Sequence, residues 1–217
     1  IQVSWGLLNF LEIIRTEKKI IKLFNACSSE CFGNIKNKPV TEKSRFNPQS
    51  PYAVAKLSAY FLIQNYRKIY NLHLTNGILF NHESSLRTEK FLSRRIISEI
   101  IAINKNKKLR MNINNIDDLK RDWGWAPEYV EAMYLINNDS IPNDYIIATG
   151  KSYTLRDFIK YTFKHFKLDY KKFVIEQKSN VNSINSLANP TKIYKNLKWK
   201  AKYDLKNIIK KMIDNEL

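Results

Sequence analysis

The spacing of apolar residues predicts alternating helices and strands in the first eighty residues of the chain. Apolar positions recur at the spacing of an amphipathic helix over residues 6–15, and a short apolar run over residues 20–26 predicts a buried parallel strand. After a loop rich in Asn, Lys and Pro, residues 52–70 predict the clearest helix, preceded by Pro51 as helices often are. Residues 72–80 then predict a second strand.

The later pattern is mainly helical. It predicts helices over residues 91–104, 128–137, 154–166 and 205–213, with one strand over residues 145–149. The polar, Ser- and Asn-rich segment 177–189 is expected to be a surface loop. Helix, strand, helix and strand in succession are typical of a doubly wound sheet, so we predict the α/β fold class.

Charge changes this picture little. The 217 residues carry a formal net charge of +17, which would suggest nucleic acid or an acidic membrane as a partner. The excess Lys, however, is spread along the whole chain together with abundant Asn and Ile. This distribution indicates an amino-acid usage bias, so we expect an anionic small substrate and no nucleic acid.

Composition also bears on location and metals. No apolar run approaches the roughly 20 residues of a membrane span, and the N-terminus does not have the pattern of a signal peptide. We therefore expect no membrane association and a cytoplasmic protein. Cys27 and Cys31 lie four residues apart without further ligands at paired spacing, so we expect no metal site and interpret both as small buried residues.

Three polar groups lie where an open α/β sheet binds its ligands, near the carboxyl ends of its strands. They are Ser28-Ser29-Glu30 after the first strand, Tyr52 to Lys56 at the start of the long helix, and Asn81-His82-Glu83 after the second strand. The spacing of four puts Tyr52 and Lys56 on one helix face, where the ammonium is expected to lower the pKa of the phenol from about 10. Such a tyrosine can exchange a proton with a sugar hydroxyl while hydride moves.

Each group also has an ordinary structural interpretation. The tyrosine and lysine can be a packed ring and a solvated ammonium, and Glu30 can be a solvated loop acid. His82 after an apolar strand is equally compatible with a structural role, and Arg121 beside Asp122 with a surface ion pair. The two tryptophans of the following segment are interpreted as packing residues: Trp123 and Trp125.

Five strings in the chain form a recognisable series. They are N-A-C-S-S-E-C-F-G (25–33), S-P-Y-A-V-A-K (50–56), G-I-L-F-N-H-E-S (77–84), R-D-W-G (121–124) and I-A-T-G (147–150). In this order they resemble the A-S-T-S-E-x-[YF]-G, S-P-Y-A-x-A-K, G-I-L-F-N-H-E-S, R-D-W-G and I-A-T-G motifs of the GDP-mannose 4,6-dehydratases. This family is a branch of the extended short-chain dehydrogenases/reductases, or NAD-dependent epimerases/dehydratases. The resemblance covers nearly all of the chain, and the N-H-E-S and R-D-W-G strings are specific to the branch.

The resemblance implies a chain without the front third of the family, which would carry a glycine-rich turn. This sequence has five glycines, no two of them close together, and so contains no phosphate-cradling turn of the usual kind. We expect residues 1–80 to form the second half of a Rossmann-type doubly wound parallel sheet. Residues 81–217 are expected to form mainly a smaller, mostly helical substrate domain, with segments that return to the sheet.

The resemblance also implies a reaction, the NADP-dependent conversion of GDP-mannose into GDP-4-keto-6-deoxymannose by internal redox and loss of water. Tyr52, beside Lys56, would deprotonate the 4-hydroxyl. Glu30 would remove the C5 proton and protonate the departing 6-hydroxyl, and Ser28, where the family usually has Thr, would hydrogen-bond the 4-oxygen. The remaining matches are positions that contact NADP (Lys56, His82 and Arg87) and positions that contact the nucleotide sugar (Asn81 and Arg121). The intact family is expected to form homo-oligomers.

The sequence departs from the family pattern at several positions. Ser85 stands where the family usually has Pro, and Lys198 replaces the Gly before Trp199. An Arg-Pro pair of the family, which supplies an Arg that contacts the diphosphate, falls near Ser179-Asn180 here. Two alternatives therefore stay open: an NADP-dependent 4-keto-sugar reductase or epimerase of the same superfamily, which would not need Glu30 as a base, and an inactive fragment.

Overall fold

A three-stranded parallel sheet forms the centre of one half of the molecule. The computed structural model describes residues 2–17, 19–35, 38–178 and 185–214. The sheet has the order β1 (Leu23–Ser28), β2 (Leu74–Leu79) and β7 (Asp144–Ile147). Parallel pairing aligns all three carboxyl ends at one edge, because β1 and β2 pair from Leu23–Leu74 to Ser28–Leu79, and β2 and β7 pair up to Leu79–Ile147.

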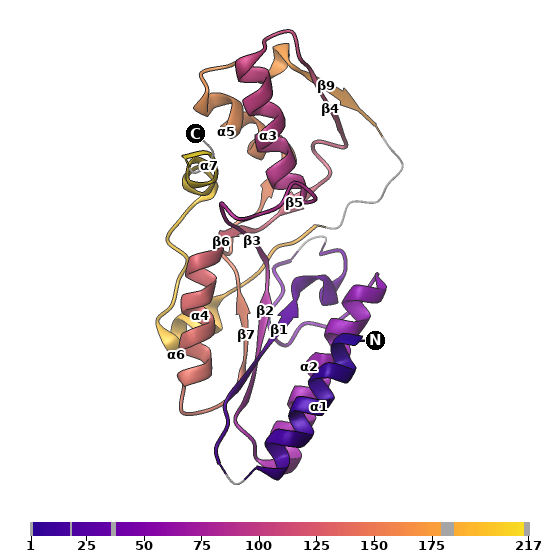
Figure 1. The fold of residues 1–217 in the computed structure, drawn as a ribbon, viewed down its shortest axis with the longest axis vertical. Coiled ribbons are helices and arrows are strands. Elements are labelled where there is room, and N and C mark those ends of the chain that lie inside the picture. The colour runs from indigo at the N-terminus through magenta and orange to yellow at the C-terminus, as the bar shows by residue number, and fades with distance from the viewer. Residues whose placement is uncertain (1, 18, 36–37, 179–184, 215–217) are drawn as a thin grey trace.

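Helices cover both faces of this sheet. Helix α2 (Pro51–Tyr70) packs on β1 and β2, and α1 (Gln2–Thr16) packs against α2. On the other face, α4 (Ala126–Asn138) contacts β1 and β2, while α6 (Thr191–Leu197) contacts β7 (Figure 1). Helices on both faces of a parallel sheet define the α/β doubly wound architecture, which confirms the predicted fold class.

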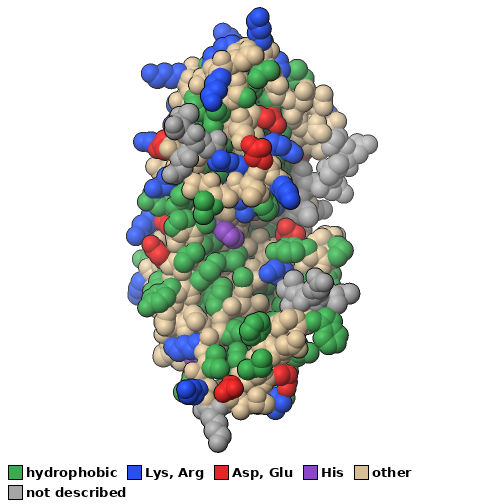
Figure 2. Space-filling view, viewed as in Figure 1, with side chains coloured by type: hydrophobic (Ala, Val, Ile, Leu, Met, Phe, Trp, Pro, Cys, Tyr) green, Lys and Arg blue, Asp and Glu red, His purple; other side chains and the backbone are tan. Residues whose placement is uncertain are grey.

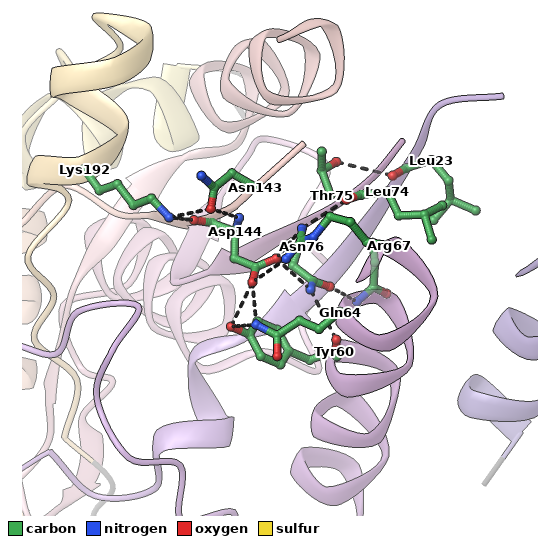
Figure 3. Close-up of polar contacts among 11 residues, drawn as sticks. Leu23, Tyr60, Gln64, Arg67, Leu74, Thr75, Asn76, Asn143, Asp144 and Lys192 are labelled. Carbon is green, nitrogen blue, oxygen red and sulfur yellow. Dashed lines mark hydrogen bonds and ion pairs between the residues drawn. The ribbon is translucent and has the colours of Figure 1, made fainter. Parts of the chain in front are cut away.

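A buried carboxylate on β7 ties α2 to the sheet. Asp144 accepts hydrogen bonds from Tyr60 Oη (3.1 Å) and Gln64 Nε2 (2.6 Å), and it forms a two-pronged ion pair with Arg67 at 3.0 Å for each contact (Figure 3). Asn76 Nδ2 on β2 donates a further bond at 2.9 Å. Because Tyr60, Gln64 and Arg67 all belong to α2, this network fixes the helix along the sheet.

The other half of the molecule is built on three helices and short strand pairs. Helices α3 (Leu92–Lys105), α5 (Leu155–His165) and α7 (Leu205–Asp214) share one apolar core, in which Ile97, Phe158 and Ile208 are fully buried. The strand pairs of the described residues are β3 (Asn81–Glu83) with β6 (Trp123–Trp125), β4 (Met111–Asn114) with β9 (Val174–Gln177), and β5 (Lys120–Arg121) with β8 (Tyr153–Thr154). Two 3₁₀ turns complete the described elements: η1 (Ser29–Phe32) and η2 (Tyr170–Lys172). The buried Trp123 and Trp125 belong to this core, which confirms them as packing residues.

The sequence pattern located the long elements and missed the short ones. The first strand begins at Leu23 instead of residue 20, because pairing with β2 starts there and Ile20 and Ile21 are exposed. Strands β3 to β6, β8 and β9 and helix α6 were not predicted, since elements of two to seven residues are too short to show a period. The order of strand pairing in the second half of the molecule is therefore a property of the tertiary structure.

The expected surface loop over residues 177–189 is wrong at its two ends, whereas residues 179–184 lie outside the described residues. Gln177 ends β9, and Ser186 and Ala188 are buried. The Asp122 N–H donates to Ser186 Oγ at 3.1 Å, and Ala188 forms a β-bridge with Val40. Polar Ser and Asn residues suggested solvent, but here they satisfy main-chain groups between the two halves of the molecule.

One face of the molecule shows how its charged side chains are distributed. On the face shown in Figure 2, Lys and Arg side chains are scattered over both halves and do not form a continuous stripe. Among the described residues, no helix is both long enough and apolar enough to span a membrane.

Candidate active site

All eight residues predicted to act in the site line one cavity. Its volume is about 620 Å³, and it lies at the carboxyl ends of β1 and β2 beside the first turn of α2. The predicted residues on its wall are Ser28, Glu30, Tyr52, Lys56, Asn81, His82, Arg87 and Arg121. Residues separated by up to 93 positions (28 to 121) thus meet in one place, as the rule for ligand sites in open α/β sheets predicts.

The turn after β1 presents Glu30 to the cavity. Ser28 ends β1 and caps η1, because its Oγ accepts a hydrogen bond from the Glu30 N–H at 3.2 Å. Ser50 Oγ donates to Glu30 Oε2 at 3.5 Å while it accepts a bond from the Ala53 N–H at 3.1 Å as the N-cap of α2. Ser50 therefore couples the position of the carboxylate to the start of the helix.

Tyr52 and Lys56 share one face of α2, as their spacing predicts. Lys56 Nζ lies 5.8 Å from the centre of the Tyr52 ring and donates a hydrogen bond to the Ala26 carbonyl at 3.0 Å. The tyrosine is half exposed toward the cavity.

The expectation that the pKa of Tyr52 is lowered is wrong for this structure. Partial burial raises the pKa of Tyr52, the Glu30 carboxylate raises it further, and interaction with the Ser28 hydroxyl lowers it in part. The Lys56 ammonium, which donates a hydrogen bond to the Ala26 carbonyl and lies 5.8 Å from the centre of the Tyr52 ring, does not reverse the net rise. The hydroxyl of Ser28 favours the phenolate.

His82 and Asn81 follow β2 at the cavity wall. His82 Nδ1 lies 2.8 Å from the Phe80 carbonyl oxygen. Because a carbonyl can only accept a hydrogen bond, Nδ1 carries the hydrogen and donates it, which leaves Nε2 available to other partners. The ring packs 5.2 Å from the ring of the fully buried Tyr129. Asn81 Oδ1 is buried without a hydrogen-bond partner among the described residues, which favours a ligand contact at this position.

Two arginines bring positive charge to the same wall. Arg87 pairs with the buried Glu83 at 3.2 Å and lies over the Phe91 ring, 3.7 Å from its centre. Burial lowers the pKa of Arg121, and the carboxylates of Glu30 and Glu83 partly reverse this effect. Both arginines also line a second cavity of about 210 Å³, which adjoins the first through Glu30 and Asn81.

Sequence reasoning gave no role in the site to three residues that support it. Asp122 is fully buried and not a surface ion pair, and it binds the Thr149-Gly150 turn. Glu83 accepts a hydrogen bond from Ser93 Oγ at 2.7 Å. The third is Ser50, for which the sequence held a usable signal, since Ser before Pro at a helix start is a common N-cap pattern.

The parallel sheet with helices on both faces and a cavity at its strand ends defines the chain as an α/β protein of the Rossmann type. Two solved structures share this fold closely. A protein named RMD from Pseudomonas aeruginosa, solved with NADPH, superposes with a TM-score of 0.88 at 16% identity, covering 97% of this chain and 71% of that one. A dTDP-glucose 4,6-dehydratase from Bacillus anthracis, solved with NAD, gives a TM-score of 0.86 at 17% identity, covering 97% and 66%.

Sequence comparison narrows this class to one family. The family model described as GDP-mannose 4,6 dehydratase matches residues 2–212, so the chain belongs to that family. The chain is 36% identical to GDP-mannose 4,6 dehydratase 1 of Arabidopsis thaliana over 99% of its length, and 41% identical to the Drosophila melanogaster relative over 74%. It spans 61% and 41% of the lengths of these two relatives. Ser179 and Asn180, where the family Arg-Pro pair falls, lie outside the described residues.

Proposed function

We propose that this chain carries the catalytic residues of a GDP-mannose 4,6-dehydratase, which forms GDP-4-keto-6-deoxymannose with NADP. The observation that supports the proposal most directly is the cavity at the strand ends, because residues predicted from separate motifs line it together. We also propose the division at residue 80 between the cofactor half and the mainly substrate-binding half.

The donor set of the cavity suits a dinucleotide and a nucleotide sugar. Lys56, Arg87 and Arg121 supply positive charge, and the unpartnered Asn81 Oδ1 supplies an acceptor in a buried position. We assign Lys56, His82 and Arg87 to NADP, and Asn81 and Arg121 to the nucleotide sugar, whose diphosphate suits a guanidinium. When bound, the nicotinamide would accept hydride from C4 of the sugar and return it to C6.

The protein groups in this proposal move protons. Tyr52 accepts the proton of the 4-hydroxyl, and the Ser28 hydroxyl, which interacts with it, hydrogen-bonds the same oxygen. Glu30 removes the C5 proton, which the neighbouring ketone acidifies, and delivers a proton to the departing 6-hydroxyl. A carboxylate suits both tasks because it can accept a proton and donate it again nearby.

Replacing Glu30 by Gln in a full-length protein that carries this chain tests the assignment. Gln keeps the shape of the side chain and can still meet Ser50, but it cannot accept the C5 proton. We expect about a 10²–10⁴-fold loss of 6-deoxy product, as for other positioned bases, with NADPH still formed transiently. The exposed Glu131→Gln on α4 is the matched control.

Product formation by Glu30→Gln at a near-normal rate would show that Glu30 is not the base. Such a result would favour a 4-keto-sugar reductase or epimerase, which needs the Tyr52 chemistry without a C5 base. Loss of every redox step in Glu30→Gln would instead indicate that the residue binds substrate.

We propose further that the full protein is a cytoplasmic homo-oligomer. Helices α1 and α2 leave large apolar side chains exposed on the surface of the chain, among them Trp5, Phe10, Val54 and Phe61. A second copy that covers them would remove this apolar area from water. Sedimentation equilibrium of the full-length protein, compared with a Phe10→Glu variant, tests the association.

A further inference from the structure

Two thiols lie in contact beside the proposed catalytic residues. Cys27 in β1 and Cys31 in η1 are both buried and free, and their sulfur atoms are 3.6 Å apart. Either sulfur can donate the hydrogen of this contact. The sulfurs are in van der Waals contact, and a disulfide would bring them to about 2.05 Å.

The pair has a route to small oxidants. Cys27 lines the cavity of about 620 Å³ that also holds Tyr52 and Lys56. Cys31 lies behind it and contacts the Ala53 carbonyl of α2 at 3.5 Å. A molecule of the size of hydrogen peroxide that enters the cavity thus meets Cys27 first, with Cys31 in place as the second sulfur.

We propose that Cys27 and Cys31 form a reversible disulfide under peroxide, which makes this site redox-sensitive. The Cys27 sulfur, which lines the cavity, attacks one peroxide oxygen, and its proton passes to the departing hydroxide. The O–O bond breaks, Cys27 becomes a sulfenic acid, and the released hydroxide takes up a proton as water. The Cys31 sulfur then displaces the sulfenic oxygen, which leaves with the Cys31 proton as a second water. The two thiols are oxidised by two electrons, and one peroxide is reduced to two waters.

The disulfide would change the cavity wall, because the two cysteines flank a segment of the chain that forms part of it. Ser28, Ser29 and Glu30 lie between them and all line the cavity. Drawing the sulfurs from 3.6 Å to bonding distance shifts this turn and removes the Cys31 contact with α2. The consequence for turnover rests on the function proposed above, whereas the disulfide itself does not.

The test uses the 217-residue chain, in which these two are the only cysteines. The reduced, folded chain is treated with hydrogen peroxide, quenched with catalase, denatured and exposed to a maleimide before its intact mass is measured. We expect the number of maleimides added to fall from two to none, with a loss of about 2 Da for two hydrogens and no dimer on a non-reducing gel. Dithiothreitol should restore both additions.

Two additional measurements make the outcome decisive. Cys31→Ala should stop at a sulfenic acid on Cys27, which dimedone traps, and the wild-type chain should form the disulfide faster when folded than in urea. Two maleimides after peroxide, a cross-linked dimer, or added oxygen without a disulfide would overturn the proposal.

In the full-length protein, peroxide should abolish turnover reversibly. A reduced protein without turnover would count against the proposed function, while the maleimide count would still decide the disulfide.

Discussion

Asp122 Oδ1 accepts two hydrogen bonds from Thr149, one from its N–H at 3.0 Å and one from its hydroxyl at 2.7 Å. The other carboxylate oxygen accepts a bond from the Gly150 N–H at 2.8 Å. These contacts join the R-D-W-G string to the I-A-T-G string, which lies at the end of β7. They hold β6, and with it the neighbouring Arg121, against the edge of the sheet where the cavity opens.

The burial of Asp122 should make the stability of the chain depend on pH. Burial raises the pKa of Asp122 to about 6 from 3.8, although the bonds from Thr149 and Gly150 oppose this change. The folded state therefore binds the proton of the Asp122 carboxyl more tightly than the unfolded state does. The stability that this proton contributes is present below about pH 4 and is lost as the pH rises to about 6. The shift corresponds to about 3 kcal/mol.

Urea unfolding of Asp122→Asn at pH 4 and pH 7 checks this effect. Wild-type protein should lose about 2 kcal/mol more than the variant between these two pH values, because at pH 4 part of the full effect is already lost. The exposed Asp118→Asn should behave like wild type. Parallel pH profiles for wild type and Asp122→Asn would contradict the prediction.

Gly124→Ala should disturb the support of His82. A Cβ at position 124 would lie 2.2 Å from Cε2 of the Tyr129 ring, which packs against His82 from the core. Because Tyr129 is fully buried and cannot move freely, we expect a loss of about 1–3 kcal/mol in the free energy of unfolding.

The control for this substitution is Gly6→Ala on α1. A Cβ at Gly6 meets no atom within 4 Å, so alanine should stabilise the helix by about 0.5–1 kcal/mol. The prediction requires that Gly124→Ala lowers the free energy of unfolding and that Gly6→Ala does not. It does not require the two changes to be equal in size. An unchanged free energy of unfolding for Gly124→Ala in urea would show that Tyr129 can move to make room for the added methyl group.

Ser28→Ala should raise the pKa of Tyr52 further, because the hydrogen bond with the Ser28 hydroxyl lowers it. If the phenolate of Tyr52 accepts the sugar proton, the rising limb of the pH profile of kcat should move to higher pH. The rate below this limb should fall about tenfold for each unit of the pKa shift.

The profile is measured in the full-length protein with Ser28→Thr and Ser58→Ala as comparisons. Threonine keeps a hydroxyl and should restore the wild-type profile, while Ser58 is exposed on α2 and should have no effect. A lower rate without any movement of the limb would indicate that Ser28 only positions substrate.

Asp144→Asn should destabilise the whole chain. The substitution breaks the buried pair with Arg67 and the bonds from Tyr60 and Gln64, for which we expect a loss of about 3 kcal/mol. Burial by itself raises the pKa of Asp144, but Arg67, Gln64 and Asn76 lower it on balance. Its contribution is therefore present above pH 3.8, the ordinary value, and is lost as pH falls below it.

Thermal and urea unfolding at pH 7 and pH 3 check both the size and the sign. The difference in the free energy of unfolding between wild type and Asp144→Asn should be smaller at the lower pH. The exposed Glu131→Gln should have the same free energy of unfolding as wild type at either pH. A gap that widens in acid would mean that the carboxylate is not held ionised by α2.

The sequence by itself determined the α/β class and the long helices, and its resemblance to a family supplied eight of the residues that line the cavity. The positions of Tyr52 and Lys56 and the edge where the site lies also follow from simpler features. These features are local or follow from a general rule. The N-cap Ser50 with Pro51 begins α2, the spacing of Tyr52 and Lys56 puts them on one face, and parallel strands bring their carboxyl ends to one edge. Each property depends on a few neighbouring residues or on the direction of the strands, so it can be inferred before the chain is folded.

Only the tertiary structure decided what surrounds those residues. Asp122 meets Thr149 across 27 positions, Ser186 is buried by the segment around β6, and Cys27 and Cys31 lie within contact of each other. The pKa of Tyr52 rises where the spacing of Lys56 suggested a fall, because burial and the position of Glu30 outweigh the nearest charge in the sequence. Burial and the distance between charges depend on the packing of distant segments, and this packing sets the chemistry of the side chains that the motifs bring to the site.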